Sequence, residues 1–437
     1  MTISMEKSNS EPESCRYFSQ FEKAGYYNTD AVHLNAGAPG TELLRMLPPI
    51  IDAATNHRMQ NELEGDAQLF QYGDERGNWQ FRSFLAKFLS EEYGDPVNSE
   101  QLFLTGGASS GLWLVLSRLF RAGSLVFVED PSYFAALKVF VDLNMKVIAV
   151  KTDDEGIVVD DLKMKIKKLF PDEPTICRPP LQALLYLIPV YHNPTGYILP
   201  EGRCHQLISL AQKYSITILC DDVYNLLHYD GLKTCPKRLF SLDKESYPEY
   251  VGNVISNGSF SKILGPGLRI GWLEAPKWAI EMFQDFGVLT SGGGLNTFTS
   301  GIITSLLALG KMNTHLQKVK NIYKTHMDAT AELLREELPP NCTLKSPAKG
   351  GYFLWIELPE NMSSSNLLPF AKKMYEVDFM PGIRASPSGS FSNYIRICIS
   401  FYPLDVLLSA VRRLCLAISD FQLKANDDPD FWQSYMN

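Results

Sequence analysis

From residue 101 onwards, short apolar runs alternate with segments whose apolar residues recur at helical spacing. Leu125–Glu129 and Val147–Lys151 are typical of strands, whereas Ala108–Phe120 and Phe134–Leu143 are typical of amphipathic helices. Further strands and helices are predicted at Gln101–Thr105, Val159–Phe170, Leu184–Val190, Gln206–Tyr214, Thr217–Cys220 and Val254–Asn257. Such alternation predicts an α/β fold in which a mostly parallel sheet lies between helices.

The pattern changes after Gly310, where a long helix is predicted at Asn313–Leu338. The remaining elements predicted beyond it are the strands GYFLWIEL and YIRICISF and helices near Leu367–Tyr375 and at Leu404–Phe421. Strands and helices mixed in this way are typical of an α+β unit. We therefore expect a smaller second domain towards the C-terminus.

Length and composition agree with a two-domain globular protein. The chain has 437 residues, of which 45% are hydrophobic and 21% charged, as is usual for soluble proteins. The divisions that we expect are a polar N-terminal segment at 1–28, a large domain at 60–310 and a small domain formed by 29–59 and 311–437.

The charge, the cysteines and the N-terminus speak against a nucleic-acid or membrane surface, disulfides, a metal site and a signal segment. A net charge of −8 speaks against a nucleic-acid-binding or anionic-membrane surface, so an anionic ligand must be held by local positive groups. The eight cysteines are scattered without a CxxC pair, which indicates buried thiols and neither disulfides nor a metal site. The N-terminus lacks an apolar signal core, and no apolar run is long enough to span a membrane. We therefore expect a cytoplasmic protein.

A lysine with small neighbours follows the predicted strand at Val254–Asn257. In Ser259-Phe260-Ser261-Lys262 two hydroxyl side chains surround the position, and Arg269 lies seven residues further along. A lysine in a dry site loses its proton more easily and can then condense with a carbonyl group. The serines and Arg269 are suited to bind a phosphate. Taken alone, the motif also fits a surface turn with incidental basic residues.

Polar residues follow four other predicted strands. Asn193, Tyr133 and the pair Asp221 and Tyr224 each come directly after a strand, and the turn Thr105–Ser110 joins a strand to a helix. Free backbone N–H groups at such a helix start bind phosphate well. A buried carboxylate such as Asp221 needs a cationic partner. Each motif alone also fits a helix cap, but together they predict a ligand site at the carboxyl ends of the strands.

The order and content of these motifs resemble the pyridoxal-phosphate (PLP) enzymes of fold type I, the class I and II aminotransferases of the aspartate aminotransferase superfamily. The resemblance covers residues 33–420, and it is closest to the 2-aminoadipate and kynurenine aminotransferase branch, which shares the spacing from Lys262 to Arg269. It implies a large PLP-binding domain and a smaller C-terminal domain. It also implies a transaminase that moves an amino group between an L-2-amino acid and a 2-oxo acid, with 2-aminoadipate or an aromatic or aliphatic amino acid as donor.

The resemblance assigns roles to individual residues. Lys262 would hold PLP as a Schiff base and shuttle the proton at the substrate Cα, and Asp221 would pair with the pyridine nitrogen. The catalytic set would thus be Lys262, Asp221 and Tyr224. The other implied cofactor contacts are Tyr224 and Asn193 on the phenolic oxygen, Tyr133 on the ring face, and Ser259, Arg269 and the N–H groups of Ala108 and Ser109 on the phosphate.

Three further residues follow from the same resemblance. Arg396 matches the arginine that binds the substrate α-carboxylate, and Gly37 and Asn193 would line the substrate pocket. Without the family context, Arg396 also fits a strand arginine that points to solvent. Tyr72 matches a tyrosine that family members donate to the phosphate of the neighbouring subunit, which implies a homodimer.

Two alternatives to a transaminase remain open. A PLP-dependent carbon–sulfur β-lyase would use the same residues, because only the fate of the reacting intermediate differs. A non-catalytic relative that binds PLP or a partner protein would not need Lys262, Asp221 and Arg396 together, and all three are present.

Overall fold

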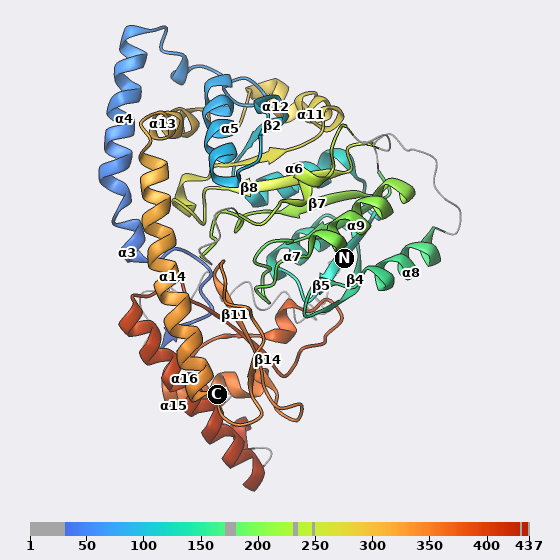
Figure 1. Ribbon diagram of the computed structural model, residues 1–437, viewed down its shortest axis with the longest axis vertical. Helices are drawn as coiled ribbons and strands as arrows, with labels where there is room; N and C mark the ends of the chain where they lie inside the picture. The colour runs from blue at the N-terminus through green and yellow to red at the C-terminus, as the bar shows by residue number, and fades with distance from the viewer. Residues whose placement is uncertain (1–30, 171–180, 230–234, 247–249, 429–430, 436–437) are drawn as a thin grey trace, which may run out of the picture.

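The computed structural model of the chain describes residues 31–170, 181–229, 235–246, 250–428 and 431–435. A large mixed sheet flanked by helices lies above a smaller antiparallel sheet with its own helices (Figure 1). This arrangement confirms the predicted fold class. The predicted polar segment 1–28 lies outside the described residues.

The large sheet has eight strands in the order β2-β9-β8-β7-β6-β3-β4-β5. Strands β8, β7, β6, β3 and β4 are parallel, whereas β9 is antiparallel to both of its neighbours and β5 is antiparallel to β4. The strands are β2 Leu102–Thr105, β3 Leu125–Asp130, β4 Lys146–Asp153, β5 Gly156–Ile157, β6 Ala183–Leu187, β7 Thr217–Asp221, β8 Val254–Ser259 and β9 Gly271–Glu274. The sequence did not predict β9, whose residues Gly-Trp-Leu-Glu begin and end with types that are uncommon in strands.

Helices cover both faces of this sheet (Figure 1). In β6, Leu184 and Tyr186 pack into one core cluster and Leu185 and Leu187 into the other, as expected for successive residues of a strand. The helices of this part are α5 Trp79–Tyr93, α6 Ala108–Leu119, α7 Phe134–Asp142, α8 Val159–Leu169, α9 Glu201–Tyr214, α10 Leu239–Leu242, α11 Lys277–Gln284, α12 Gly287–Gly292 and α13 Thr297–Ala308. Three 3₁₀ helices join them: η1 Gln68–Phe70, η2 Ser99–Gln101 and η3 Pro266–Leu268.

Several predicted boundaries differ from the structure, among them those of β6 and α9. Strand β6 ends at Leu187 and not at Val190, because the amide of Ile188 donates to the carboxylate of Glu129 and Pro189 has no amide hydrogen to donate. Helix α9 begins at Glu201, five residues before the predicted start.

The small sheet has four strands in the order β10-β11-β14-β13, and all of its pairs are antiparallel. Its strands are β10 Thr343–Leu344, β11 Phe353–Glu357, β13 Met380–Pro381 and β14 Tyr394–Cys398. Nearby, β1 Val32–His33 pairs with β12 Val377–Asp378, so the start of the described chain lies against this part. The surrounding helices are α14 Lys311–Glu337, α15 Ser364–Tyr375, α16 Leu404–Asp427, η4 Gly382–Ala385 and η5 Phe431–Tyr435.

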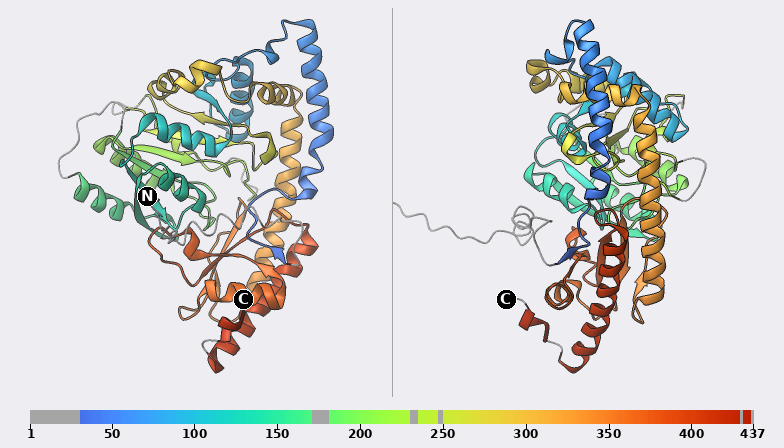
Figure 2. Two further views of the ribbon diagram at one scale, coloured as in Figure 1. Left: turned by 180° about the vertical axis from the view of Figure 1, so that it is seen from behind. Right: turned by 90° about the vertical axis from the view of Figure 1, so that its left-hand side faces the viewer.

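Helix α14 connects the two parts. It runs from the level of the large sheet to that of the small sheet, where it packs against α16 (Figures 1 and 2). The short α3, Thr41–Leu44, leads into α4, Leu47–Glu64, which packs on α13 beside the large sheet. The predicted domain limits near 60 and 310 stay a prediction. In the described part of the chain, none of the helices has the length and apolar character needed to cross a membrane.

A buried ion pair ties the start of α10 to strand β9 of the large sheet. The guanidinium of Arg238, which is 2% exposed, donates to the carboxylate of Glu274 at the end of β9. It also lies 4.1 Å from the ring centre of Tyr93. Removing one member of such a pair leaves the other charge buried and uncompensated.

We predict that Arg238→Ala lowers the free energy of unfolding by about 3–5 kcal/mol. The matched control is Lys237→Ala, whose pair with Glu201 is exposed to solvent and should change stability far less. Urea unfolding followed by tryptophan fluorescence measures both. Equal stabilities for the two variants would contradict the prediction.

Candidate functional site

The predicted lysine lies between the two sheets. Lys262 follows the carboxyl end of β8 and is half-buried, and its ammonium donates a hydrogen bond of 2.7 Å to the carbonyl oxygen of Gly37. The rings of Tyr224 and Tyr352 have their centres 6.0 and 5.7 Å from the ammonium nitrogen. The structure therefore brings Lys262 and Gly37, which are distant in the sequence, into direct contact.

The surroundings of Lys262 favour its neutral form. Burial lowers the pKa of Lys262 to about 8, which outweighs the opposite effects of Cys398 and Asp221, and the positive charge of Arg396 acts in the same direction as burial. A lysine with this pKa carries a usable fraction of free amine near neutral pH. It is therefore suited to attack a carbonyl group.

Asp221 ends the neighbouring strand β7 and is 7% exposed. Its Oδ2 accepts a 2.6 Å hydrogen bond from the hydroxyl of Tyr186, whereas its Oδ1 is buried and has no hydrogen-bond partner among the described residues. Burial raises the pKa of Asp221 to about 6, so the carboxylate is charged at neutral pH. A buried anionic oxygen without a partner fits a ligand that offers a charged N–H group, as the pyridinium of PLP does.

Arg396 connects the small sheet to the loop after β6. Its Nη1 donates to Asn193 Oδ1 at 2.9 Å, and its Nη2 donates to the carbonyl oxygen of Asn35 at 2.8 Å. Its guanidinium carbon lies 4.1 Å from the ring centre of Phe353, and the residue is only 3% exposed. Arg396 therefore points into the site and not to solvent.

The predicted phosphate turn begins helix α6. Gly107 has a φ of +95°, and a Cβ at this position would lie 2.8 Å from Arg269 Nη2, so the turn requires glycine. Arg269 Nη2 donates to the carbonyl oxygen of Gly106 at 2.9 Å, and Asn257 Nδ2 donates to that of Ala108 at 2.9 Å. The first N–H groups of α6, including those of Ala108 and Ser109, have no partner within the helix. Beside a guanidinium they are suited to bind a phosphate.

Ser259 and the two predicted tyrosines lie at neighbouring strand ends. The hydroxyl of Ser259 accepts from the amide of Ser261 at 3.0 Å and lies 2.9 Å from its hydroxyl. Burial raises the pKa of Tyr133 to about 12, with a further contribution from the carboxylate of Asp221. Burial also raises the pKa of Tyr224 well above its ordinary value. Both phenols therefore stay protonated and can donate hydrogen bonds.

Tyr72 is not brought to this site. It lies on the loop after η1 with 79% of its surface exposed, and within the described ranges its backbone amide bonds only to its neighbour Gln71. The other predicted residues gather around Lys262 and the start of α6. Their roles toward a cofactor stay predictions.

Sequence reasoning missed four residues of the site: Tyr186, Asn257, Tyr352 and Phe353. The hydroxyl of Tyr352 donates to the carbonyl oxygen of Lys262 at 2.6 Å, which fixes the backbone that carries the lysine. The signal in the sequence was weak, because Tyr186 lies within an apolar run and the other aromatic residues read as ordinary strand residues.

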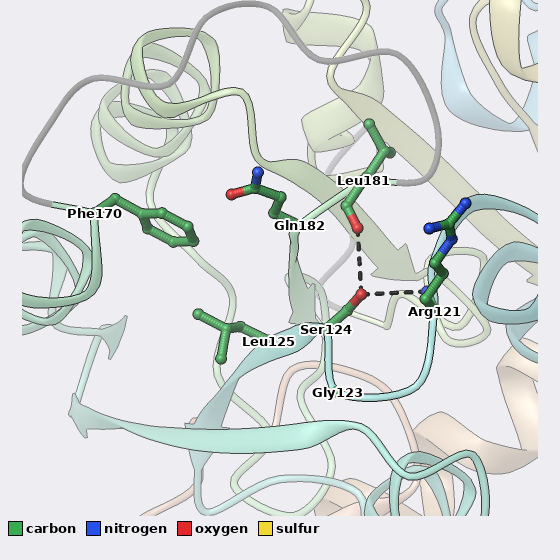
Figure 3. Close-up of a pocket in the computed structure, with 7 residues that line it drawn as sticks. All are labelled: Arg121, Gly123, Ser124, Leu125, Phe170, Leu181 and Gln182. Carbon is green, nitrogen blue, oxygen red and sulfur yellow. Dashed lines mark hydrogen bonds between the residues drawn. The ribbon is translucent and has the colours of Figure 1, made fainter.

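A hollow of about 380 Å³ lies elsewhere in the large sheet, and its lining residues are drawn in Figure 3. It lies at the amino ends of β3 and β6, the edge opposite to Lys262, and Ser124 at its centre bonds to Arg121 and Leu181. The lining residues are Arg121, Gly123, Ser124, Leu125, Phe170, Leu181 and Gln182. None of the predicted site residues belongs to this set.

Known proteins resemble the chain over most of its length. The family model for class I and II aminotransferases matches residues 29–414. Over 396 residues the chain is 29% identical to aromatic-amino-acid aminotransferase 1 of Thermococcus litoralis, covering 90% of this chain and 89% of that protein. Over 352 residues it is 30% identical to the 2-aminoadipate transaminase of Thermus thermophilus, covering 80% and 81%.

A similar structure has been solved with a cofactor form bound. The kynurenine aminotransferase of Pyrococcus horikoshii, in complex with PMP, superposes with a TM-score of 0.81 at 26% identity. The match covers 96% of this chain and 97% of that chain.

We predict that the rate at which PLP attaches to the protein follows the lowered pKa of Lys262. Because only the neutral amine reacts, the rate should rise about tenfold per pH unit below the pKa and level off above pH about 8. Stopped-flow absorbance of the bound cofactor measures this dependence. Nα-acetyllysine, with an ordinary amine, is the control, and a protein rate that still rises at pH 10 would contradict the prediction.

Proposed function

We propose that this chain, which belongs to the class I and II aminotransferase family, transfers amino groups with Lys262, Asp221 and Arg396 as its central residues. It is a PLP-dependent transaminase that acts on amino acids and 2-oxo acids. The observation that carries the residue assignment is the half-buried lysine with a lowered pKa between a buried carboxylate and a buried arginine.

Each of the three residues has a distinct task in the reaction. Bound PLP supplies a carbonyl group and an electron sink. The amine of Lys262 takes the proton from the substrate Cα and returns one as general base and acid. Asp221 Oδ1 keeps a positive charge on the ring nitrogen, and Tyr186 holds the other oxygen of the carboxylate in place.

Arg396 selects substrates that carry an α-carboxylate. Its planar guanidinium can bind both carboxylate oxygens, and its bond to Asn193 fixes its orientation relative to the loop after β6. The adjacent rings of Tyr224 and Phe353 exclude water, which strengthens this charge pair. Asn193 and Tyr224 are the residues that we expect to hold the phenolic oxygen of PLP, with Tyr133 against the ring face.

We expect the amino donor to be one of the kinds of amino acid on which the relatives act. Their names specify aromatic amino acids and 2-aminoadipate as substrates, and the solved neighbour acts on kynurenine. We extend this range to the chain as 2-aminoadipate or an aromatic or aliphatic amino acid. The reaction would take place in the cytoplasm, in agreement with the six cysteines of the described chain, which are all free.

The active unit in this proposal is a homodimer. Aromatic side chains that a monomer leaves exposed occur close together on η1 and α13, where the rings of Phe70 and Phe298 lie 6.1 Å apart. Exposed aromatic groups of this kind are enriched in protein interfaces. Tyr72 lies two residues after Phe70, so an interface here would carry Tyr72 towards the partner subunit.

We predict that Lys262→Ala lowers the turnover number at least about a thousandfold, because the proton at Cα loses its acceptor. The test gives a panel of amino donors with 2-oxoglutarate or pyruvate and measures the new oxo acid. Wild-type protein should be yellow with PLP and bleach with a good donor. Release of pyruvate and thiol without an oxo-acid acceptor would instead indicate a β-lyase, and a wild-type protein that stays colourless would exclude PLP chemistry.

We predict that Tyr72 acts across the dimer. Tyr72→Phe should weaken PLP binding about tenfold, through the loss of one hydrogen bond to a charged group. A mixed dimer contains one Tyr72→Phe subunit and one Lys262→Ala subunit. If Tyr72 is donated across the interface, the site of the first subunit combines its own Lys262 with the Tyr72 of the second, so this site is native. Titration with PLP should show native affinity at that site. If Tyr72 serves its own subunit, no site in the mixed dimer binds with native affinity.

A further inference from the structure

Besides the bonds of Arg396 to Asn193, of Ser346 to Thr195 and of Tyr352 to Lys262, two sets of contacts join the small sheet to the large one on opposite sides of Arg396. On the side of β11, the amide of Tyr229 donates to Lys349 at 3.0 Å and that of Gly351 donates to Leu227 at 2.8 Å. These bonds join backbone to backbone close to Tyr224. They form a fixed connection that no side-chain substitution removes.

On the side of β13, a side-chain pair and a single backbone bond make the connection. The hydroxyl of Ser386 donates to Asp130 Oδ1 at 2.6 Å, and beside it the amide of Ser132 donates to the carbonyl oxygen of Ala385 at 2.8 Å. Asp130 is 8% exposed, whereas Ser386 is half-buried. A short bond to a carboxylate with little access to water is stronger than a bond between neutral groups.

Each end of this contact leads directly to a residue of the site. Asp130 ends β3, three residues before Tyr133 at the start of α7. Ser386 follows η4, which continues from β13, and Met380 of β13 pairs with Arg396 of β14. The contact therefore sets the distance between the strand that carries Arg396 and the turn that carries Tyr133.

We propose that Ser386 and Asp130 form a latch that determines substrate affinity by holding Arg396 against the large sheet. The inference rests on the proposed function, in which the substrate binds Arg396 of the small sheet through its carboxylate and faces Lys262 through its amine. A substrate that spans two sheets binds more tightly when their relative position is set in advance. Ser386 and Asp130 are thus positioning residues that touch neither substrate nor cofactor.

The latch should act on substrate binding and not on cofactor binding. Lys262, Asp221 and the turn at the start of α6 all belong to the large sheet and its loops, so opening the latch leaves their mutual positions unchanged. The expected signature of a latch variant is a raised KM for the amino acid and the oxo acid together. The Kd for PLP and the turnover number at saturation should stay within about twofold of the wild type.

The experiment compares Ser386→Ala with Ser386→Thr, which keeps the hydroxyl, and with Ser390→Ala on the same loop. The side-chain hydroxyl of Ser390 bonds to Ser388 and not to Asp130, so this variant is the matched control. Ser386→Ala loses the bond to Asp130 and also the contacts of the same hydroxyl with the Ser390 amide and the Ser388 hydroxyl. We expect it to raise both KM values about tenfold, as the loss of the bond to the charged Asp130 implies. Glutarate, which lacks the reactive carbonyl of 2-oxoglutarate, should bind the PLP-loaded variant more weakly by a similar factor in calorimetry.

The outcomes separate the latch from a general role in folding. Near-native KM values in Ser386→Thr and Ser390→Ala, together with the raised values in Ser386→Ala, would support the latch. An unchanged KM in Ser386→Ala would overturn it, whether or not the melting temperature falls, and so would an equal rise in Ser390→Ala. If the wild-type protein transaminates no donor, the proposed function fails, and the latch fails with it. This result differs from an unchanged KM in Ser386→Ala, which is measured only when the wild-type protein is active and overturns the latch alone.

Discussion

A buried negative charge at the end of β7 constrains the residues around it. Asp221 has one oxygen satisfied by Tyr186 and the other without a partner among the described residues. A carboxylate in this setting destabilises the fold until a cationic or N–H group meets it. Lys262 is mostly charged at neutral pH, because its pKa is about 8, but its ammonium donates to Gly37 and leaves Asp221 Oδ1 without a partner. The ligand that completes the site therefore also stabilises the native state, by the general linkage between binding and folding.

Much of the site was predictable because parallel strands end at one edge of a sheet. Lys262, Asp221, Asn193 and Tyr133 each follow an apolar run in the sequence, and this placement was enough to predict that they meet. Tyr186 could not be found in this way. It lies inside an apolar run, and only the pairing of β6 with β7 brings its hydroxyl to Asp221.

The small sheet shows a different limit of sequence reasoning. The family motif identified Arg396, but its partners come from three separate segments and include the backbone of Asn35 and the ring of Phe353. Such contacts depend on how one sheet is placed over the other, which periodicity along a single strand does not encode. Strand β9 was missed because Gly-Trp-Leu-Glu contains few strand-forming residues, and its pairing with β2 and β8 is what makes it a strand.

Helix α14 determines whether the two parts of the molecule can fold as separate fragments. Most of its buried apolar residues belong to one continuous hydrophobic core that also contains Leu306 of α13 and Leu414 of α16. The hydroxyl of Tyr323, on the same helix, lies 3.2 Å from that of Tyr352, which in turn donates to the backbone of Lys262. Cutting the chain between the two sheets would strip one face of this helix of its packing. The two halves are therefore not independent modules, and neither fragment should survive alone as a folded protein.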